Sequence, residues 1–550
     1  MRNRVKKRWL AVLSATALAA AVSPLAASQP VAAAPAPAKM HIDCATGTPL
    51  CTEVLDSEAV FGEDVYVGHD EPSLVFYDNR QGAGNNNTYL LRLPKDPPRL
   101  PNQQGTGGTF NFQIRATFWL GMALCDNESA PEFTHAPCTP DSDTNIFDSP
   151  DPNDPHYIGK HPGTAFLELQ FYPPGWVAWP PGLSCDARQW CAAMAIFSLS
   201  LDQNTGTQNN ADCLAKAGIE PANFAFVTKN GRSHAPADPL LATVQTFTPN
   251  PATDLFMNSN DLLAVHIGDT AAGLRTDIAD LSTGQLGSMT ASPANQFGQV
   301  VFDPTAKTCT SRPYAFHPMY GSSSEHTRVP WAAHSYNVSF SDEIGHFEYC
   351  DAVAAEGGAC TKPGGSDRGN PPDADDVACF SPASSTRIQV GGCLGTDGDF
   401  DGVSYHRVWP GSTTPAQDAQ LHPRSVLFSS PRFNGLQRYS RIAFEADLPR
   451  IEAADVIDPR LPPCNRTTGA NCVNPPPGAE FYPLYTTRNG GAFGCQWQFG
   501  GTNIPGTKQT FGGTSTAEFG PLLTLTYPGV GFQPVNRINN FRRVLDHNPC

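Results

Sequence analysis

Hydrophobic and polar residues alternate along many short segments of the chain, which is the pattern of half-buried β-strands. The clearest examples are residues 109–118 and 165–172. In the second segment every other side chain shares a face, so two sets are expected: Ala165, Leu167, Leu169 and Phe171 on one side, and Phe166, Glu168, Gln170 and Tyr172 on the other. Further strands are predicted at 192–201, 223–228, 262–267, 277–281, 287–292, 341–349, 425–428, 441–447, 479–486, 495–499 and 522–527.

Turn signals separate these strands, and few segments have helical spacing. Lys229-Asn230-Gly231 and Thr283-Gly284-Gln285 are typical of turns. Helices are expected only at 211–217 and 537–545. The pattern predicts a mostly β protein: an antiparallel β-sandwich or jelly roll over 39–353, a Gly/Pro-rich, disulfide-bearing loop or linker at 354–395, and a second β-rich region at 396–550.

The N-terminus has the order of a secretory signal. Five positive charges within the first eight residues precede a short apolar stretch and then a run of small residues and prolines. We therefore expect residues 1–38 to be removed on export, and the alternative is an N-terminal membrane anchor. No other apolar run reaches spanning length, so the mature chain is expected to be extracellular and to lack a transmembrane segment.

The chain contains 16 cysteines, an even number that predicts disulfides in an oxidising compartment. Close pairs such as Cys185 and Cys191 have a spacing that suits a disulfide closing a short loop. The sequence does not determine which cysteines pair with which. The formal net charge is −16, and loss of the basic leader makes it more negative. Such a chain is repelled by polyanions at long range, so nucleic acid is not an expected partner.

The strand at 165–172 carries the most informative polar residues. Glu168 and Gln170 lie between Phe166 and Tyr172 on one face, and Trp176 follows after a short Pro/Gly segment. Aromatic rings stack on apolar patches of a sugar or peptide, and a carboxylate with an amide orients it. This strand is the expected substrate-binding element. The alternative is an ordinary solvent-facing strand, which has the same pattern.

A second carboxylate-bearing strand is predicted at 341–349. Its face carries Asp342, His346 and Glu348. If Glu168 and Glu348 meet across one cleft, they form the carboxylate pair of a hydrolase, with His346 orienting the substrate.

One segment has the oxygen-ligand spacing of a cation loop. Asp397, Asp399 and Asp401 alternate before Gly402, which suits a hard cation such as Ca²⁺. Position twelve of an EF-hand loop requires Glu and is Val408 here, so an EF-hand is excluded. A structural Ca²⁺ site and a plain acidic turn remain open, and no other cofactor is expected.

Residues 261–292 resemble a hairpin of the glutamic peptidases, the eqolisins. The likeness lies in a strand led by Asp261, the turn Leu281-Ser282-Thr283-Gly284-Gln285, and the earlier aromatic stretch 168–176. The resemblance implies a concanavalin-like β-sandwich. That family works with a Glu/Gln pair, and its catalytic glutamate would lie in a stretch equivalent to 294–300, which contains no glutamate. We therefore expect this chain to share the fold of that family, and we do not assign the family's catalytic residues to it. The overall pattern also resembles secreted actinomycete proteins.

Three functions are consistent with these features. The first is a secreted protein that binds or hydrolyses a glycan through a sandwich face, with an extracellular polysaccharide or protein as partner. The second is a non-catalytic surface or adhesion protein. The third is a glutamic-peptidase-like hydrolase.

Overall fold

The computed structural model describes residues 69–70, 73–78, 80, 82–100, 118–129, 164–174, 185–202, 207–318, 336–342, 344–345, 350–353, 360–363, 416, 425–447, 485–503, 505, 522–528, 535–545 and 547–550. All of them belong to His41–Cys550, the larger of two compact units of the chain. This unit is mostly β, as predicted, and its strands pair antiparallel.

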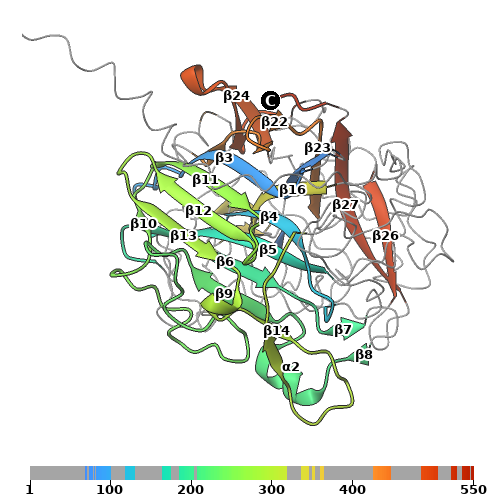
Figure 1. Ribbon diagram of the computed structural model, residues 1–550. Helices are drawn as coiled ribbons and strands as arrows, with labels where there is room; N and C mark the ends of the chain where they lie inside the picture. The colour runs from blue at the N-terminus through green and yellow to red at the C-terminus, as the bar shows by residue number, and fades with distance from the viewer. Residues whose placement is uncertain are drawn as a thin grey trace, which may run out of the picture. The chain divides into compact units, whose positions relative to one another are not determined.

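One large sheet is formed by ten of the described strands (Figure 1). Nine of them follow one another in the order β10 (Phe256–Met257), β6 (Trp190–Phe197), β5 (Thr164–Tyr172), β4 (Phe118–Cys125), β16 (Tyr336–Asp342), β2 (Ser73–Asp78), β23 (Arg441–Asp447), β27 (Val535–Leu545) and β26 (Leu522–Pro528). The tenth, β9 (Ala222–Phe226), also pairs with β6. We call this the first sheet.

The second sheet contains nine described strands. Seven are ordered β13 (Leu286–Thr290), β12 (Arg275–Asp280), β11 (Leu262–Gly268), β3 (Asn86–Arg92), β20 (Leu427–Phe428), β25 (Cys495–Phe499) and β24 (Tyr485–Asn489). The remaining two are β21 (Arg432–Phe433), which also pairs with β3, and β22 (Gln437–Arg438), which pairs with β21. Strands from 73–92 therefore hydrogen-bond directly to strands from 425–545 in both sheets.

Smaller elements complete the described chain. Four strand pairs stand apart from the large sheets: β1 (His69–Asp70) with β17 (Ile344–Gly345), β7 (Leu201–Asp202) with β8 (Thr207–Gln208), β14 (Gly298–Val300) with β15 (Ser311–Pro313), and β18 (Cys350–Val353) with β19 (Cys360–Pro363). The helical elements are α2 (Ala211–Ala217) and the 3₁₀ turns η7 (Pro293–Asn295) and η9 (Gly491–Phe493).

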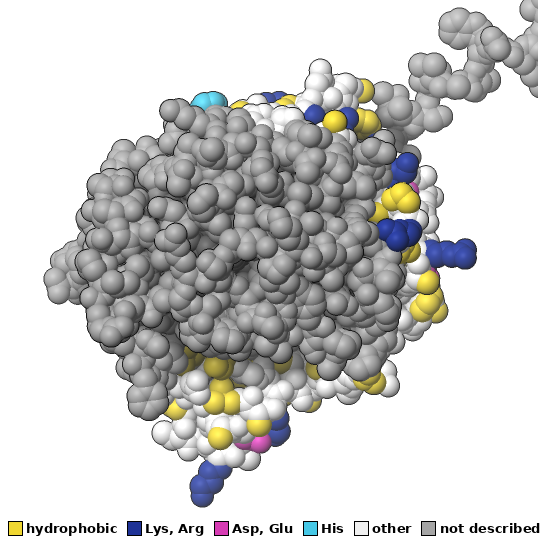
Figure 2. Space-filling model, turned by 180° about the vertical axis from the view of Figure 1, so that it is seen from behind, with side chains coloured by type: hydrophobic (Ala, Val, Ile, Leu, Met, Phe, Trp, Pro, Cys, Tyr) yellow, Lys and Arg dark blue, Asp and Glu magenta, His cyan; other side chains and the backbone are white. Residues whose placement is uncertain are grey.

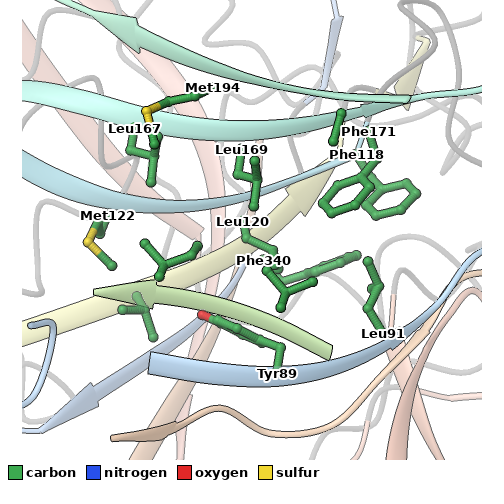
Figure 3. Packing of buried hydrophobic residues seen from close by; sticks show 14 of the residues in the cluster. Tyr89, Leu91, Phe118, Leu120, Met122, Leu167, Leu169, Phe171, Met194 and Phe340 are labelled. Atoms are coloured by element: carbon green, nitrogen blue, oxygen red, sulfur yellow. The ribbon is translucent and has the colours of Figure 1, made fainter. Parts of the chain in front are cut away.

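The two large sheets share one hydrophobic core. The predicted inward residues of β5, Ala165, Leu167, Leu169 and Phe171, are all fully buried in it. Phe340 of β16 contacts aromatic rings of both sheets: its ring stacks on Phe428 of the second sheet with centroids 3.8 Å apart. It lies 5.7 Å from Phe118 of the first sheet; Figure 3 labels Phe340 and Phe118. Because one set of side chains is buried between both sheets, the strands form a sandwich.

The helix α2 spans 211–217, as predicted. Asn210 caps its N-terminus by accepting a hydrogen bond from the Cys213 backbone N–H at 3.0 Å, and Gly218 ends it with a φ of 75°. Both residues are the types that favour these positions. Cys213 forms a disulfide with Cys309, so the helix is tied to the segment before β15.

The second predicted helix, 537–545, is wrong. These residues lie in β27, where Phe541 pairs with Leu522 on one side and with Ala446 on the other. Apolar residues at spacings of three and four gave a helical pattern there. Pairing with two neighbouring strands satisfies the backbone hydrogen-bonding groups instead. The tertiary context overrides a weak local preference for helix.

Most predicted strands overlap observed strands. Of the predicted strand 341–349, only residues 341–342 of β16 and 344–345 of β17 are described, and of 479–486 only residues 485–486, at the start of β24. β2 and β3 were not predicted. Two further differences concern β4. Residues 109–117 lie outside the described chain, and β4 begins at Phe118, where the predicted strand was expected to end. β4 was not predicted because every residue in it is buried and none is charged. A strand covered on both faces has no alternation to detect.

Three disulfides are described. Cys185–Cys191 closes a short loop, as its spacing suggested, whereas Cys213–Cys309 and Cys495–Cys550 join residues far apart in the sequence. Cys125 is also disulfide-bonded. In the described part of the chain, no helix combines the length and the apolar character needed to cross a membrane.

Candidate functional site

The candidate site lies on the outward face of the first sheet, around β5. Glu168 is paired in register with Gly121 of β4 and with Ala195 of β6, and Gln170 is paired with Trp119 and Ala193. Cross-strand neighbours lie about 5 Å apart at Cβ. The small residues on β6 and at Gly121 are covered by aromatic rings of this face.

Three polar side chains of β5 form a hydrogen-bonded chain on this face. Tyr172 donates its hydroxyl hydrogen to Oε1 of Gln170, and Nε2 of Gln170 donates to Oε2 of Glu168 at 2.5 Å. Gln170 is 6% exposed, whereas Glu168 and Tyr172 are half-buried. Both ends of the amide are engaged, so its orientation is fixed and it holds the carboxylate in place.

Aromatic rings lie on both sides of this polar chain. On the β4 side, Trp119 meets Phe166 edge to face with ring centroids 5.4 Å apart. Both rings lie close over Gly121, where an added Cβ would come within 2.6 Å of each. The predicted face is therefore real: Phe166, Glu168, Gln170 and Tyr172 share it, but Phe166 is buried under Trp119 rather than open to solvent.

On the other side, Tyr172 meets Phe224 of β9 with ring centroids 6.4 Å apart, and Phe224 packs on Phe226 at 5.2 Å. Edge-to-face arrangements of this kind stabilise aromatic clusters. The polar chain is thus held between two aromatic groups, one from β4 and β5 and one from β9.

Trp119 has an unusual polar group. Its side chain is 1% exposed, and its Nε1 hydrogen has no acceptor within the described structure. A buried donor without a partner costs about 1–3 kcal/mol. Among the described residues three other buried atoms share this condition, but none of them lies on the outward face of the first sheet.

The segment 231–255 packs on β9 beside the site. Phe247 lies 5.2 Å from Phe224, and the imidazole of His234 stacks on Phe226 at 5.8 Å. His234 Nδ1 is 2.9 Å from Asp254 Oδ1, and its Nε2 is 2.9 Å from the carbonyl oxygen of Gln245. The histidine therefore joins both ends of this segment.

This histidine predicts a pH dependence of stability. The hydrogen bond that His234 donates to the Asp254 carboxylate raises the pKa of His234, and partial burial opposes this shift. A raised folded-state pKa gives stabilisation that is complete below the unfolded pKa and is lost as pH rises through the folded pKa. We expect the unfolding temperature to fall as the pH rises from the unfolded-state pKa through the folded-state pKa of His234. His234→Gln should flatten this dependence of the unfolding temperature on pH. Differential scanning calorimetry between pH 5 and pH 8 measures it. A parallel profile in the variant would contradict this assignment.

The stretch where the glutamic-peptidase resemblance would place a catalytic glutamate has another role. Gln299 of β14 donates to Asp126 and, at 2.9 Å, to Asn127, and accepts from Arg312 at 2.8 Å. Asp126 is fully buried, which raises its pKa, while a 2.6 Å hydrogen bond from Ser198 opposes the shift. This network joins the end of β4 to β14 and β15.

Several predicted residues are not tested. Trp176, His346, Glu348, Asp397, Asp399 and Asp401 lie outside the described residues. The Glu168–Glu348 pair and the Ca²⁺ loop therefore stay predictions. Among the described residues, no group of three or more His, Cys, Asp or Glu side chains is placed to hold a metal. Trp119 and Gly121 were missed, because the apolar run of β4 gives no polar signal.

No protein-family model, curated protein or solved structure matches the chain.

Proposed function

We propose that the chain is an exported protein that binds a neutral polysaccharide on the outward face of the first sheet. The observation that carries the proposal is the hydrogen-bonded chain Tyr172–Gln170–Glu168 between two aromatic groups. Sugars present hydroxyl groups at their edges and apolar C–H patches on their faces. A carboxylate, an amide and a phenol bind the former, and aromatic rings pack on the latter.

The unpartnered indole N–H of Trp119 supports a polar ligand. This donor has no acceptor in the described structure, and Trp119 is 1% exposed. A sugar hydroxyl or ring oxygen that reaches it when the covering side chains move apart gains a hydrogen bond without displacing a protein partner. The carboxylate of Glu168 favours a neutral ligand over an anionic one, since a second negative charge at the same site is repelled. Export is supported by the N-terminal pattern and by the disulfides.

Binding is expected to depend on the carboxylate. Glu168→Gln removes a charged acceptor, and a hydrogen bond to a charged group contributes about 1.5–3 kcal/mol, so affinity should fall at least about tenfold. Trp119→Phe keeps a ring but removes the N–H, and a smaller loss is expected. Pull-down with insoluble cellulose, xylan and chitin, followed by calorimetry with soluble fragments, measures both effects.

The matched control is Glu220→Gln, the same substitution in the turn after α2, which should bind as the unsubstituted protein does. Failure of the unsubstituted protein to bind any of the three polysaccharides would overturn the proposal, and so would equal binding by Glu168→Gln.

A second candidate is an acid hydrolase of the glutamic-peptidase type. It is favoured by one observation, the 2.5 Å hydrogen bond between Gln170 and Glu168, which brings the two residue types of that chemistry together. Cleavage of denatured protein at acid pH that is lost in Glu168→Gln, without polysaccharide binding, would select this function over the first.

A further inference from the structure

The outward face of the second sheet presents one continuous row of residues across six strands. The backbone register aligns Arg438 of β22, Arg432 of β21, Thr88 of β3, His266 of β11, Asp277 of β12 and Ser288 of β13. We call these six residues the cross-strand row. Their strand neighbours at positions in between face the core, for example Tyr89, Val265 and Ile278. Figure 1 shows β3, β11, β12 and β13 side by side.

This face is basic although the chain is acidic. The outward residues of its described strands include five arginines, Arg92, Arg275, Arg432, Arg438 and Arg488, and one aspartate, Asp277. The whole chain has a formal net charge of −16. Described Lys and Arg side chains are seen at the edges of the view from behind (Figure 2).

The single aspartate is already neutralised. Arg275 donates to both carboxylate oxygens of Asp277, at 2.6 to 3.0 Å, and His266 Nδ1 lies 3.6 Å from the same carboxylate. Arg275 and His266 lower the pKa of Asp277 to about 2 against the opposing effect of burial. Asp277 therefore has no charge left to pair with the arginines of β21 and β22.

Arg432 and Arg438 are directly opposite each other, and both are exposed. Within the described part of the chain, no acidic side chain forms an ion pair with either of them. Like charges directly opposite on antiparallel strands repel and destabilise the pair. An external anion bridging the two guanidinium groups removes this repulsion, and guanidinium groups bind carboxylates with two parallel hydrogen bonds.

From these observations we propose that the cross-strand row binds a carboxylated polysaccharide, a polyuronate, lying across the strands. Strands are about 4.8 Å apart, so a linear chain crossing them meets a new side chain at every strand. Arg432 and Arg438 bind carboxylate groups. Thr88 and Ser288 bind hydroxyl groups, whereas His266 is held by Asn86, 3.0 Å from its Nε2, and by Asp277.

The net charge of the chain opposes every polyanion at long range, but the spacing of the arginines in the row favours a polyuronate over other polyanions. Duplex DNA carries one charge per about 1.7 Å, which is much denser than the two unpaired arginines of the row. An anionic membrane presents a broad negative surface, which a narrow row with two unpaired arginines contacts at only a few points. A single polyuronate chain carries about one carboxylate per sugar and needs only a narrow basic row.

The test uses polygalacturonate, the full-length protein and the double variant Arg432→Gln/Arg438→Gln. Affinity electrophoresis or calorimetry at neutral pH is expected to show binding that weakens about tenfold in the double variant and weakens with added salt. The matched control, Arg232→Gln/Lys307→Gln, removes two exposed cations elsewhere and should leave binding unchanged.

The site is independent of the one on the first sheet. Glu168→Gln should therefore bind polygalacturonate normally, and the double arginine variant should keep its binding of neutral polysaccharide. No binding of polygalacturonate, or equal loss in the control variant, would overturn the proposal. Equal or tighter binding to duplex DNA or to phosphatidylserine vesicles, lost in the double arginine variant, would replace the partner by another class and overturn it as well.

Discussion

Replacing Phe340 with alanine is expected to lower the free energy of unfolding by about 3–5 kcal/mol. The side chain is fully buried, and its ring contacts aromatic rings from both sheets, Phe118 and Phe428. Tyr485 also donates its hydroxyl hydrogen to the Phe340 carbonyl oxygen at 3.3 Å, and this bond can persist in the variant. The decrease in the free energy of unfolding therefore measures the cost of the cavity left between the sheets.

Equilibrium unfolding in urea, without reductant, measures this effect. Phe493→Ala is the matched control, because Phe493 is 46% exposed and its truncation should change stability by less than about 0.5 kcal/mol. Phe340→Leu keeps much of the volume and is expected to cost less than the alanine substitution. Equal midpoints for the two alanine variants would show that Phe340 does not connect the sheets.

Removing the disulfide Cys213–Cys309 is expected to cost about 5 kcal/mol, the largest effect of the three described disulfides. The bond joins residues 96 apart in the sequence, and a cross-link that closes a longer loop restricts the unfolded chain more. Cys495–Cys550, with a separation of 55, is expected to contribute about 4 kcal/mol, and Cys185–Cys191, with a separation of 6, about 2 kcal/mol.

Paired Cys→Ala variants test this order, each removing both sulfurs of one bond so that no free thiol remains. Urea unfolding of the three double variants should rank them by loop length. If the Cys185/Cys191 variant were the least stable, native contacts rather than the entropy of the unfolded chain would determine the effect.

Alternation of polar and apolar residues predicted β5 and β11, whereas β3, which is also buried on one side only, was not predicted, and β6 was predicted although it is almost fully buried. β5 and β11 alternate because one face is in the core and the other is polar or half-exposed. That alternation also identified Glu168, Gln170 and Tyr172 as neighbours on one face, and a spacing of two residues brings them within hydrogen-bonding reach. The local part of the candidate site was therefore predictable.

The contacts between side chains on neighbouring strands were not predictable from the sequence. Trp119 and Gly121 are brought to Glu168 and Gln170 by the register of β4, whose residues are all buried and give no periodic signal. The cross-strand row was missed for the same reason. Arg432 and His266 are 166 residues apart, and only the pairing of β21, β3 and β11 aligns them. Registers between distant segments depend on the whole fold.

The strand pairing between distant parts of the chain has a consequence for synthesis. β2 pairs with β23, and β3 pairs with β20, with more than 330 residues between the partners. A nascent chain that ends before residue 425 has neither partner, so β2 and β3 each keep an unpaired edge. Pairings of such high contact order form slowly, and open edges attract other strands. The sandwich is completed only when the last strands have left the ribosome, so its N-terminal half depends on its C-terminal half for protection against aggregation.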